Sequence, residues 1–437
     1  MTAVPEPLSE LMPSEAVPRG EFVLLGYPDM NGLLRGKALR RDAFAAAARE
    51  GTTMTDLLLA LDPTDTPITA YEGFGLRSGA GDLVVHAEES TLRELSWLQG
   101  WQVCIATPSW RDGGVCELAS REVLRRALGR MQTLGFETVA AVEYEVRLRD
   151  AAGRPMSAAM SYSFDQVAAY AAFLGRLLPA LDALGVELTA VHTEAGPGLL
   201  ELNLAAREGL RAADDATYLK LATRAIASSM GLSASFLAKS VRGEEGSSGH
   251  VHLSLWRDGE NAFASSEDLI GAALAGILEH LPAASLLLNP TINSYKRLVP
   301  GWFAPVNVSW GFENRSAAMR AITSEEHPER SRVECRRPGA DANPYLALAA
   351  LLAAAAEGIE RDASPPPPVE GDASERTDLP PLPRSLESAL HAFSGDLALR
   401  EALGAEFSEY YAISRRWELE QWQQAVSEWE RDRYSPL

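Results

Sequence analysis

The sequence is poor in cysteine and carries no excess of positive charge. Only three cysteines occur in 437 residues. An odd number without paired spacing argues against a disulfide framework or a zinc finger and favours a reducing compartment. Asp and Glu total 60 against 40 for Lys and Arg, which gives a formal net charge of -20. Because such a charge repels a polyanion at long range, we expect no nucleic-acid partner.

Long hydrophobic runs and phosphate loops are also missing. The longest apolar run, Tyr345 to Ala356, is too short to cross a bilayer. The first 20 residues show no basic segment followed by an apolar one. We therefore expect a cytoplasmic protein without a membrane partner. Gly73 to Gly79 is rich in glycine, but it leads into a strand-like segment and not into a helix, so it is not a phosphate loop.

The length of the chain and a change of pattern along it predict two domains. Residues 1–18 are rich in Pro, Ser and Glu, which is typical of a mobile tail. Residues 19–112 alternate short strand-like runs with one helical stretch, Arg41 to Glu50, and predict a small α+β domain. Residues 113–437 predict a larger domain of long helices and strands. Within it, the prolines of 361–383 predict an exposed loop.

Capping signals and apolar periodicity predict the helices of the larger domain. Ser120 is expected to cap a helix that runs to Gly135, and Ser163 with Gln166 is expected to form a capping box. The second of these helices would end near Gly185. Further helices are predicted at 207–230, 267–286, 344–358 and 408–433.

Four strand-like segments carry polar side chains at two-residue intervals, which places those side chains on one face of each strand. The polar residues are Glu143 and Glu145 in the first segment, Glu194 and Glu201 around a glycine turn in the second, His250, His252 and Ser254 in the third, and Arg332, Glu334 and Arg336 in the fourth.

Each segment alone has a simpler interpretation, such as a solvated strand face, packed histidines or a ladder of salt bridges. Together, five acids and the histidines are ligands suited to Mg²⁺ or Mn²⁺. Near the two arginines of the fourth segment, the chain also carries Arg297, Arg315 and Arg320. A guanidinium group can bind phosphate or carboxylate through two parallel hydrogen bonds. A site that needs both cations and arginines predicts phosphoryl transfer.

These motifs resemble those of glutamine synthetases over nearly the whole chain from about residue 20. The resemblance implies an α+β fold, with a small N-terminal β-grasp domain and a C-terminal catalytic domain of antiparallel strands surrounded by helices. The matching segments are 32–37, 91–93, 143–145, 194–201, 246–255, 293–298, 314–320 and 332–345.

The resemblance also implies a two-step ligase reaction. ATP phosphorylates the γ-carboxylate of glutamate, and an amine then displaces the phosphate. Two or three Mg²⁺ or Mn²⁺ ions are implied per site, with hexameric rings, often stacked as dodecamers, that share active sites between neighbouring subunits. The implied roles are one metal ion on Glu145, Glu194 and Glu201, a second on Glu143, His250 and Glu334, the nucleotide side for His252 and Ser254, phosphate contacts for Arg315, Arg320 and Arg332, and the amino-acid substrate for Arg297, Arg336 and Gly246.

The departures from the family pattern all fall on the acceptor side. Phe303 stands where ammonium-using members have a glutamate, Glu245 replaces a usual Asn, and Leu199 replaces a usual Gln. A pocket of Trp302, Phe303 and Leu199 would suit an organic amine, and Glu245 could hold the distal ammonium of a diamine. We therefore expect similarity to the γ-glutamylpolyamine and γ-glutamylamide ligases.

Three alternatives remain open at this point. Phe303 could simply pack beside the active site, in which case the enzyme would be an ammonium-using glutamine synthetase. A metal-dependent hydrolase also begins its site with two histidines on a strand, but it would leave the arginines unexplained. A catalytically silent assembly protein would have to keep costly buried acids without their ions.

Overall fold

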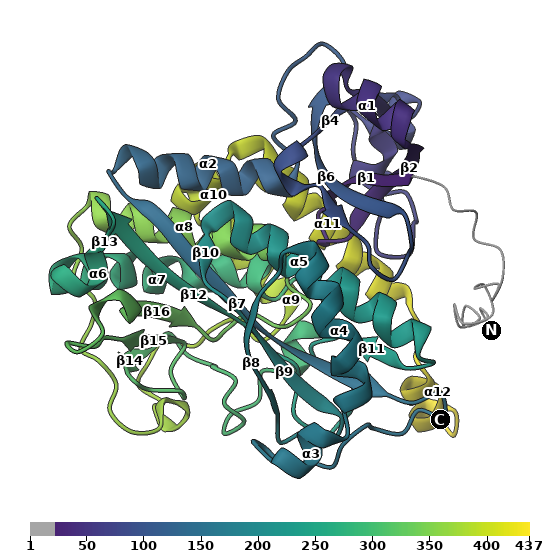
Figure 1. Ribbon diagram of the computed structural model, residues 1–437. Helices are drawn as coiled ribbons and strands as arrows, with labels where there is room; N and C mark the ends of the chain where they lie inside the picture. The colour runs from purple at the N-terminus through teal and green to yellow at the C-terminus, as the bar shows by residue number, and fades with distance from the viewer. Residues whose placement is uncertain (1–21) are drawn as a thin grey trace.

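The computed structural model describes residues 22–437, so the predicted tail at 1–18 lies outside the described residues. Its N-terminal part is a six-stranded sheet in the order β2-β1-β6-β4-β3, with β5 paired to β6 (Figure 1). Helix α1, Arg41–Glu50, confirms the predicted helix. The strands are β1 Phe22–Pro28, β2 Leu34–Arg40, β3 Thr52–Thr55, β4 Asp82–Ala87, β5 Arg93–Glu94 and β6 Trp101–Trp110.

A ten-stranded sheet forms the centre of the larger part, in the order β14-β15-β16-β12-β7-β9-β8, with three short strands at its sides. Every pair is antiparallel except β14 with β15. This mixture of sheets and helices confirms the predicted α+β class. The strands are β7 Glu137–Arg149, β8 Leu188–Thr193, β9 Leu199–Leu204, β10 Arg207–Glu208, β11 Ser233–Ser235, β12 Gly249–Arg257, β13 Glu260–Asn261, β14 Trp310–Phe312, β15 Met319–Ile322 and β16 Arg332–Cys335.

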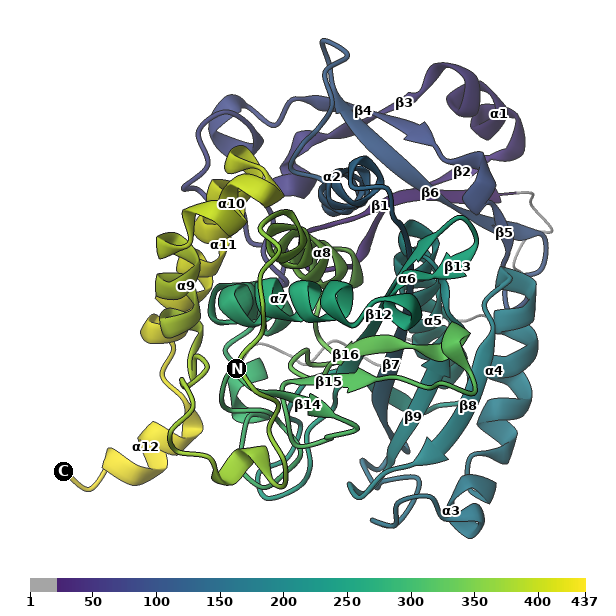
Figure 2. The same ribbon diagram turned by 90° about the vertical axis from the view of Figure 1, so that its left-hand side faces the viewer.

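Long helices cover the apolar face of this sheet and leave its polar face free (Figure 2). On β7 the buried residues alternate with the carboxylates, and Tyr144 lies under the ammonium of Lys220 on α5, 4.2 Å from its ring centroid. The helices are α2 Ser120–Thr133, α3 Phe164–Ala168, α4 Ala171–Leu184, α5 Gly209–Ser229, α6 Ala262–Ser265, α7 Glu267–Leu288, α8 Pro344–Glu360, α9 Leu386–Gly395, α10 Leu397–Leu403, α11 Ala405–Gln424 and α12 Glu428–Tyr434.

Helices α7 and α8 cross backbone to backbone at two glycines. A Cβ added at Gly276 would lie 2.2 Å from the carbonyl oxygen of Ala354, and one at Gly358 would lie 2.0 Å from that of Ala272. Helix α7 also has the length and hydropathy of a membrane span. However, 78% of its apolar window is buried within the fold, and the core helix of a soluble protein meets the same criterion.

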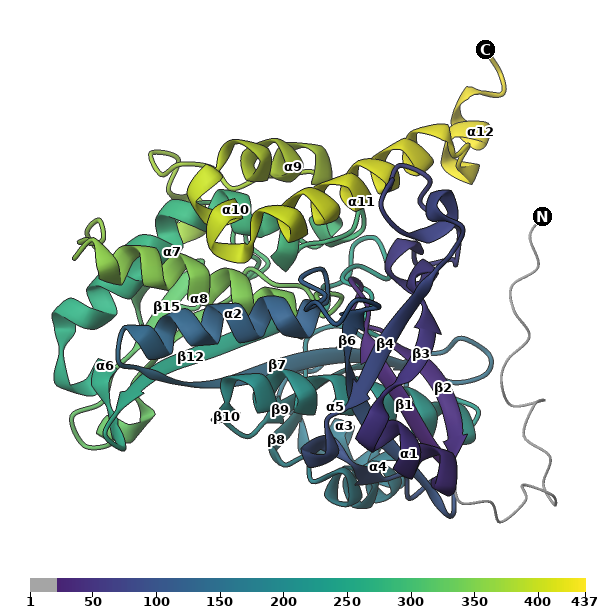
Figure 3. The same ribbon diagram turned by 90° about the horizontal axis from the view of Figure 1, so that it is seen from above.

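The C-terminal helices connect the two sheets. Figure 3 shows α11 running past the N-terminal sheet. Tyr410 on α11 stacks on Tyr71 at 5.1 Å between ring centroids and donates to the carbonyl of Leu59. Asn343 donates to the carbonyl of Asp29 and also caps α8. The N-terminal sheet is therefore packed against the larger part.

Several predicted helix boundaries were wrong. Ser120 is the first residue of α2 and not its cap, because its hydroxyl donates to the carbonyl of Pro28. The helix predicted after Ser163 is interrupted between α3 and α4, and the side chain of Gln166 accepts from the amide of Ala158 instead of closing a capping box. The helix predicted at 408–433 is two helices, because Ser427 caps α12 separately.

Candidate active site

A cavity of about 470 Å³ opens where the four polar segments meet on the free face of the large sheet. Every predicted site residue except Ser254 and Leu199 lines this catalytic cavity, and the other lining residues include Tyr162, His192 and Asn203. Leu199 was expected here, but its side chain is fully buried in the core of the protein. That expectation was wrong.

Strand register assembles the first group of candidate metal ligands. On β12, His250 pairs with Glu143 of β7, and His252 pairs with Glu334 of β16. His252 Nε2 lies 3.0 Å from a Glu143 oxygen, and His250 Nδ1 lies 3.5 Å from a Glu334 oxygen. Glu143, His252 and Glu334 offer ligand atoms within 4.8 Å of one another. Both histidines therefore face the same two carboxylates.

Electrostatics in this group favour ionised acids. Burial alone would raise the pKa of Glu334, but His252 and Arg336 outweigh burial and lower it to about 2. Burial likewise opposes ionisation of Glu143, yet the two histidines hold its pKa below the ordinary value. Burial lowers the pKa of His250, which favours the neutral imidazole that a metal ligand requires. Among the described residues its buried Nε2 has no hydrogen-bond partner.

A second group forms around the glycine turn. Glu145 pairs with Glu201 across β7 and β9, and His192 of β8 pairs with Glu201 from the other side. His192 lies 3.2 Å from Glu194 and 3.0 Å from Glu201, and these three offer ligand atoms within 4.8 Å of one another. Tyr162 stacks on His192 at 4.1 Å. His192 alternates with Glu194 on one strand face, and this spacing was the signal that could have assigned it to the site.

The second group gathers three acids around the single imidazole of His192. Burial, followed by the charge of Glu201, raises the pKa of Glu145 to about 7. Burial would lower the pKa of His192, but Glu194 and Glu201 raise it to about 10. Converging buried acids are unfavourable without a counter-ion, and oxygen-rich donor sets suit Mg²⁺ or Mn²⁺. Both groups of residues therefore fit divalent metal ions.

Arginines surround the same cavity. Arg320 bridges to Glu334 at 3.1 Å, and Arg332 donates to His252 at 3.1 Å. Arg336 pairs with Glu334 and donates to the carbonyl of Arg315. The Arg315 guanidinium has no hydrogen bond or ion pair to another described residue. It is therefore available to a bound anion.

The predicted amino-acid side of the cavity is built on Arg297. This side chain is 4% exposed and donates to the carbonyls of Arg337 and Arg336. It packs directly over Gly246, where an added Cβ would lie 2.6 Å from the Arg297 Cγ. Only glycine therefore leaves room for Arg297 at this position.

Ser254 lies in an adjoining cavity of about 340 Å³. This cavity shares Glu143, His252 and Arg332 with the catalytic cavity. The hydroxyl of Ser254 accepts a hydrogen bond from Trp256 Nε1 at 2.9 Å. The arrangement places a mixed apolar and polar pocket beside the arginines.

The acceptor side contains Trp302, Phe303 and Glu245. Phe303 has a φ of 50° and its side chain is 63% exposed at the mouth of the cavity. The Lys239 ammonium lies 4.3 Å over the Trp302 ring. Burial, followed by the charge of Glu194, raises the pKa of Glu245, and its carboxylate has no ion-pair partner among the described residues.

Comparisons with known proteins agree with this geometry. The model of the glutamine synthetase catalytic domain matches residues 117–434. The γ-glutamylethanolamide synthetase GlnA4 of Streptomyces coelicolor is 34% identical over 94% of this chain and 91% of its own length. The glutamate–isopropylamine ligase of a Pseudomonas species is 34% identical over 95% of each chain. A ligand-free GmaS structure superposes with a TM-score of 0.85 at 26% identity and covers 95% of this chain and 97% of its own. The chain therefore belongs to the glutamine synthetase family.

Proposed function

We propose that the protein is an ATP-dependent carbon–nitrogen ligase that joins glutamate to an organic amine as a γ-glutamylamide. The observation that carries this proposal is Phe303, which lines a cavity whose other lining residues include the acids, histidines and arginines that we assign to metal ions and phosphate. An apolar ring shelters an alkyl substituent and disfavours a charged ammonium. The two relatives named for substituted γ-glutamylamides support the same conclusion.

In the first step, a γ-carboxylate oxygen of glutamate attacks the γ-phosphorus of ATP, and ADP leaves. Arg297 and Arg336 hold the glutamate carboxylate, while Arg315, Arg320 and Arg332 hold phosphate oxygens, because guanidinium groups pair with such oxyanions through two hydrogen bonds. Members of this family use ATP and divalent metal ions, and Mg²⁺ or Mn²⁺ would offset phosphate charge on the two acidic groups. The Ser254 pocket accommodates the nucleoside.

In the second step, the amine nitrogen attacks the acyl carbon of γ-glutamyl phosphate. The new C–N bond forms as the C–O bond to phosphate breaks, and the amine's proton leaves to a carboxylate of the cleft. Glu245 faces this side of the cavity and is suited to accept it. The products are the γ-glutamylamide, ADP and phosphate.

Product analysis by mass spectrometry with ATP, glutamate and a panel of amines tests the proposal. We expect a γ-glutamylamide with at least one organic amine and little glutamine from millimolar ammonium. Phe303→Glu should shift the preference towards ammonium by about tenfold, since a carboxylate attracts a small cation and accepts its proton. The shift should be partial because Glu245 also departs from the family pattern. Efficient glutamine synthesis by the wild type would overturn the proposal.

We further propose that the enzyme is cytoplasmic, that its N-terminal sheet domain ends near residue 112, and that it works as a hexameric ring or a stacked pair of rings. Large apolar side chains on its surface support assembly, among them Phe164 at 91% exposure and Trp429 at 56%. Light scattering on the purified protein tests the ring. A monomer with full activity would contradict it.

A further inference from the structure

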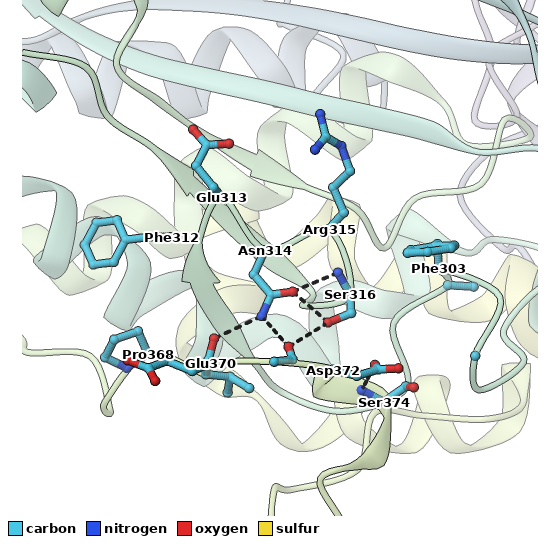
Figure 4. A pocket seen from close by; sticks show the side chains of 14 residues that line it. Phe303, Phe312, Glu313, Asn314, Arg315, Ser316, Pro368, Glu370, Asp372 and Ser374 are labelled. Atoms are coloured by element: carbon cyan, nitrogen blue, oxygen red, sulfur yellow. Dashed lines mark hydrogen bonds between the residues drawn. The ribbon is translucent and has the colours of Figure 1, made fainter. Parts of the chain in front are cut away.

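A second cavity, of about 690 Å³, adjoins the catalytic cavity (Figure 4). We call it the side chamber. Its walls come from residues 301–304, 312–316 and 368–374, and Figure 4 shows Phe303 and Phe312 on opposite sides of it. Phe303 and Arg315 line both cavities. A molecule bound in the side chamber would therefore lie next to the catalytic cavity across these two side chains.

Hydrogen bonds hold the walls of the side chamber in place. Asn314 donates from one amide nitrogen to the carbonyls of Val369 and Gly371, each at 2.9 Å. Its oxygen accepts from the amide and hydroxyl of Ser316, and this hydroxyl in turn accepts from the amide of Ala373 at 2.8 Å. The 368–374 segment is thus tied to the strand region that carries Arg315. A chamber formed this way needs little reorganisation to bind a ligand.

The chemistry of the side chamber differs between its two ends. Next to the catalytic cavity, Arg315 is the one lining residue with a positive charge. On the 368–374 segment, Glu370 has no hydrogen bond or ion pair to another described residue, and Asp372 uses one oxygen to accept from the amide of Ser374. The remaining carboxylate, on Glu313, is already paired with Arg320. The far end therefore offers the exposed carboxylates of Glu370 and Asp372 as acceptors beside the Ser374 hydroxyl. The rings of Phe303 and Phe312 also line the side chamber.

We propose that the side chamber holds the distal end of the acceptor amine and selects amines whose far end donates hydrogen bonds, either an ammonium or a hydroxyl group. The proposal rests on the proposed ligase function and specifies its substrate class. The reacting nitrogen lies beyond Phe303 towards Glu194 and Glu245, the carbon chain lies against the phenyl rings, and the distal donor reaches Glu370 and Asp372. Glu370 and Asp372 are exposed, so a plain alkylamine leaves them solvated by water and forgoes the charge pair or hydrogen bond that a distal donor would add.

The experiment compares three amines of equal chain length: butylamine, 4-amino-1-butanol and 1,4-diaminobutane. Amide formation is measured with the wild type, Glu370→Gln, Asp372→Asn and the double variant. Asparagine keeps the oxygen that caps the 373–375 turn. Glu375→Gln is the matched control, because it removes an exposed charge from the same segment outside the chamber.

We expect the double variant to lower kcat/KM for the diamine by about tenfold, because each partly exposed charge pair contributes up to about fivefold. The aminoalcohol should lose less, since glutamine and asparagine still accept a hydrogen bond. Butylamine, and the KM values for glutamate and ATP, should change less than about twofold. The diamine preference of the wild type should also fall as salt is added.

An equal loss for butylamine and the diamine, or no loss for the diamine, would overturn the side-chamber proposal while leaving the ligase function intact. Failure of the ligase function itself has a different signature, since no γ-glutamylamide would then form with any of the three amines. Ser374→Trp gives an independent measurement because its bulk would narrow the chamber. It should raise the KM for the three long amines and leave methylamine unchanged, and an unchanged KM for the long amines would also overturn the proposal.

Discussion

The Glu334 carboxylate of the candidate active site contacts two arginines and a histidine. It is 1% exposed, pairs with Arg320 and Arg336, and lies 3.5 Å from His250. A carboxylate in this position links the candidate metal group to the arginines, so its charge affects both. Removing that charge while keeping the shape of the side chain is therefore the sharpest single test of the site.

Glu334→Gln should lower ligase turnover by a hundredfold or more, an order of magnitude typical of losing several kcal/mol of transition-state charge stabilisation (about a factor of ten per 1.4 kcal/mol). ADP release measures it, and EDTA should abolish the wild-type rate until Mg²⁺ or Mn²⁺ is restored. Glu325→Gln, at an exposed position outside the catalytic cavity, is the matched control. Undiminished turnover in EDTA would refute the metal assignment.

A substitution at Arg297 should distinguish glutamate binding from ATP binding. Lysine cannot make the two parallel hydrogen bonds of a guanidinium group with a carboxylate, so Arg297→Lys should raise the KM for glutamate by about tenfold or more and change the KM for ATP little. Parallel titrations of both substrates measure this difference, and a thermal melt checks the fold, because Arg297 also donates to two backbone carbonyls. Equal losses for both substrates would mean that Arg297 serves a different ligand.

At the scale of elements, the crossing of α7 and α8 depends on the absence of two side chains. The added methyl group of Gly276→Ala would meet the Ala354 carbonyl at 2.2 Å, so the two helices must separate. We expect a loss of about 1–3 kcal/mol in the free energy of unfolding, the usual cost of overpacking a core. Gly175→Ala on α4 meets nothing within 4 Å and should stabilise by about 0.5–1 kcal/mol. Urea denaturation of both variants measures the contrast.

At the scale of the whole molecule, stability should depend on pH through Lys220. Burial, helped by Arg224, lowers the pKa of this lysine to about 7, and its ammonium donates to the carbonyl of Ala342. Above pH 7 the folded chain has lost a proton that the unfolded chain keeps up to its ordinary value near 10.5. At this position the unfolded state then binds more protons, so the contribution of Lys220 to stability rises as pH rises from 7 towards 10. The raised pKa of His192 gives a contribution of opposite sign over the same range.

Urea midpoints at pH 7, 8 and 9 measure this dependence. The free energy of unfolding of the wild type, measured relative to that of Lys220→Met, should rise by roughly 1 kcal/mol per pH unit. Lys296→Met, at an exposed position, serves as the control for removing a lysine. Equal slopes in the wild type and the Lys220 variant would show that Lys220 does not contribute to the pH dependence.

The sequence by itself determined the family, the α+β class and many of the polar residues that line the catalytic cavity, because alternation along strands places polar side chains on one face whatever the partner strand is. Helix ends were less certain, since Ser120 and Gln166 hydrogen-bond to distant or neighbouring backbone groups that no local pattern reveals.

Only the tertiary structure decided which side chains meet across strands. His192 belongs to the second acidic group because its strand register pairs it with Glu201. Leu199 is buried in the core and does not lie on the acceptor side. Tyr162 stacks on His192 from a loop without a repeating pattern. The side chamber likewise depends on Asn314 reaching the 368–374 segment. Such contacts join residues far apart in the chain, and the physical reason that the sequence alone could not specify them is that register and loop packing are set by the whole core.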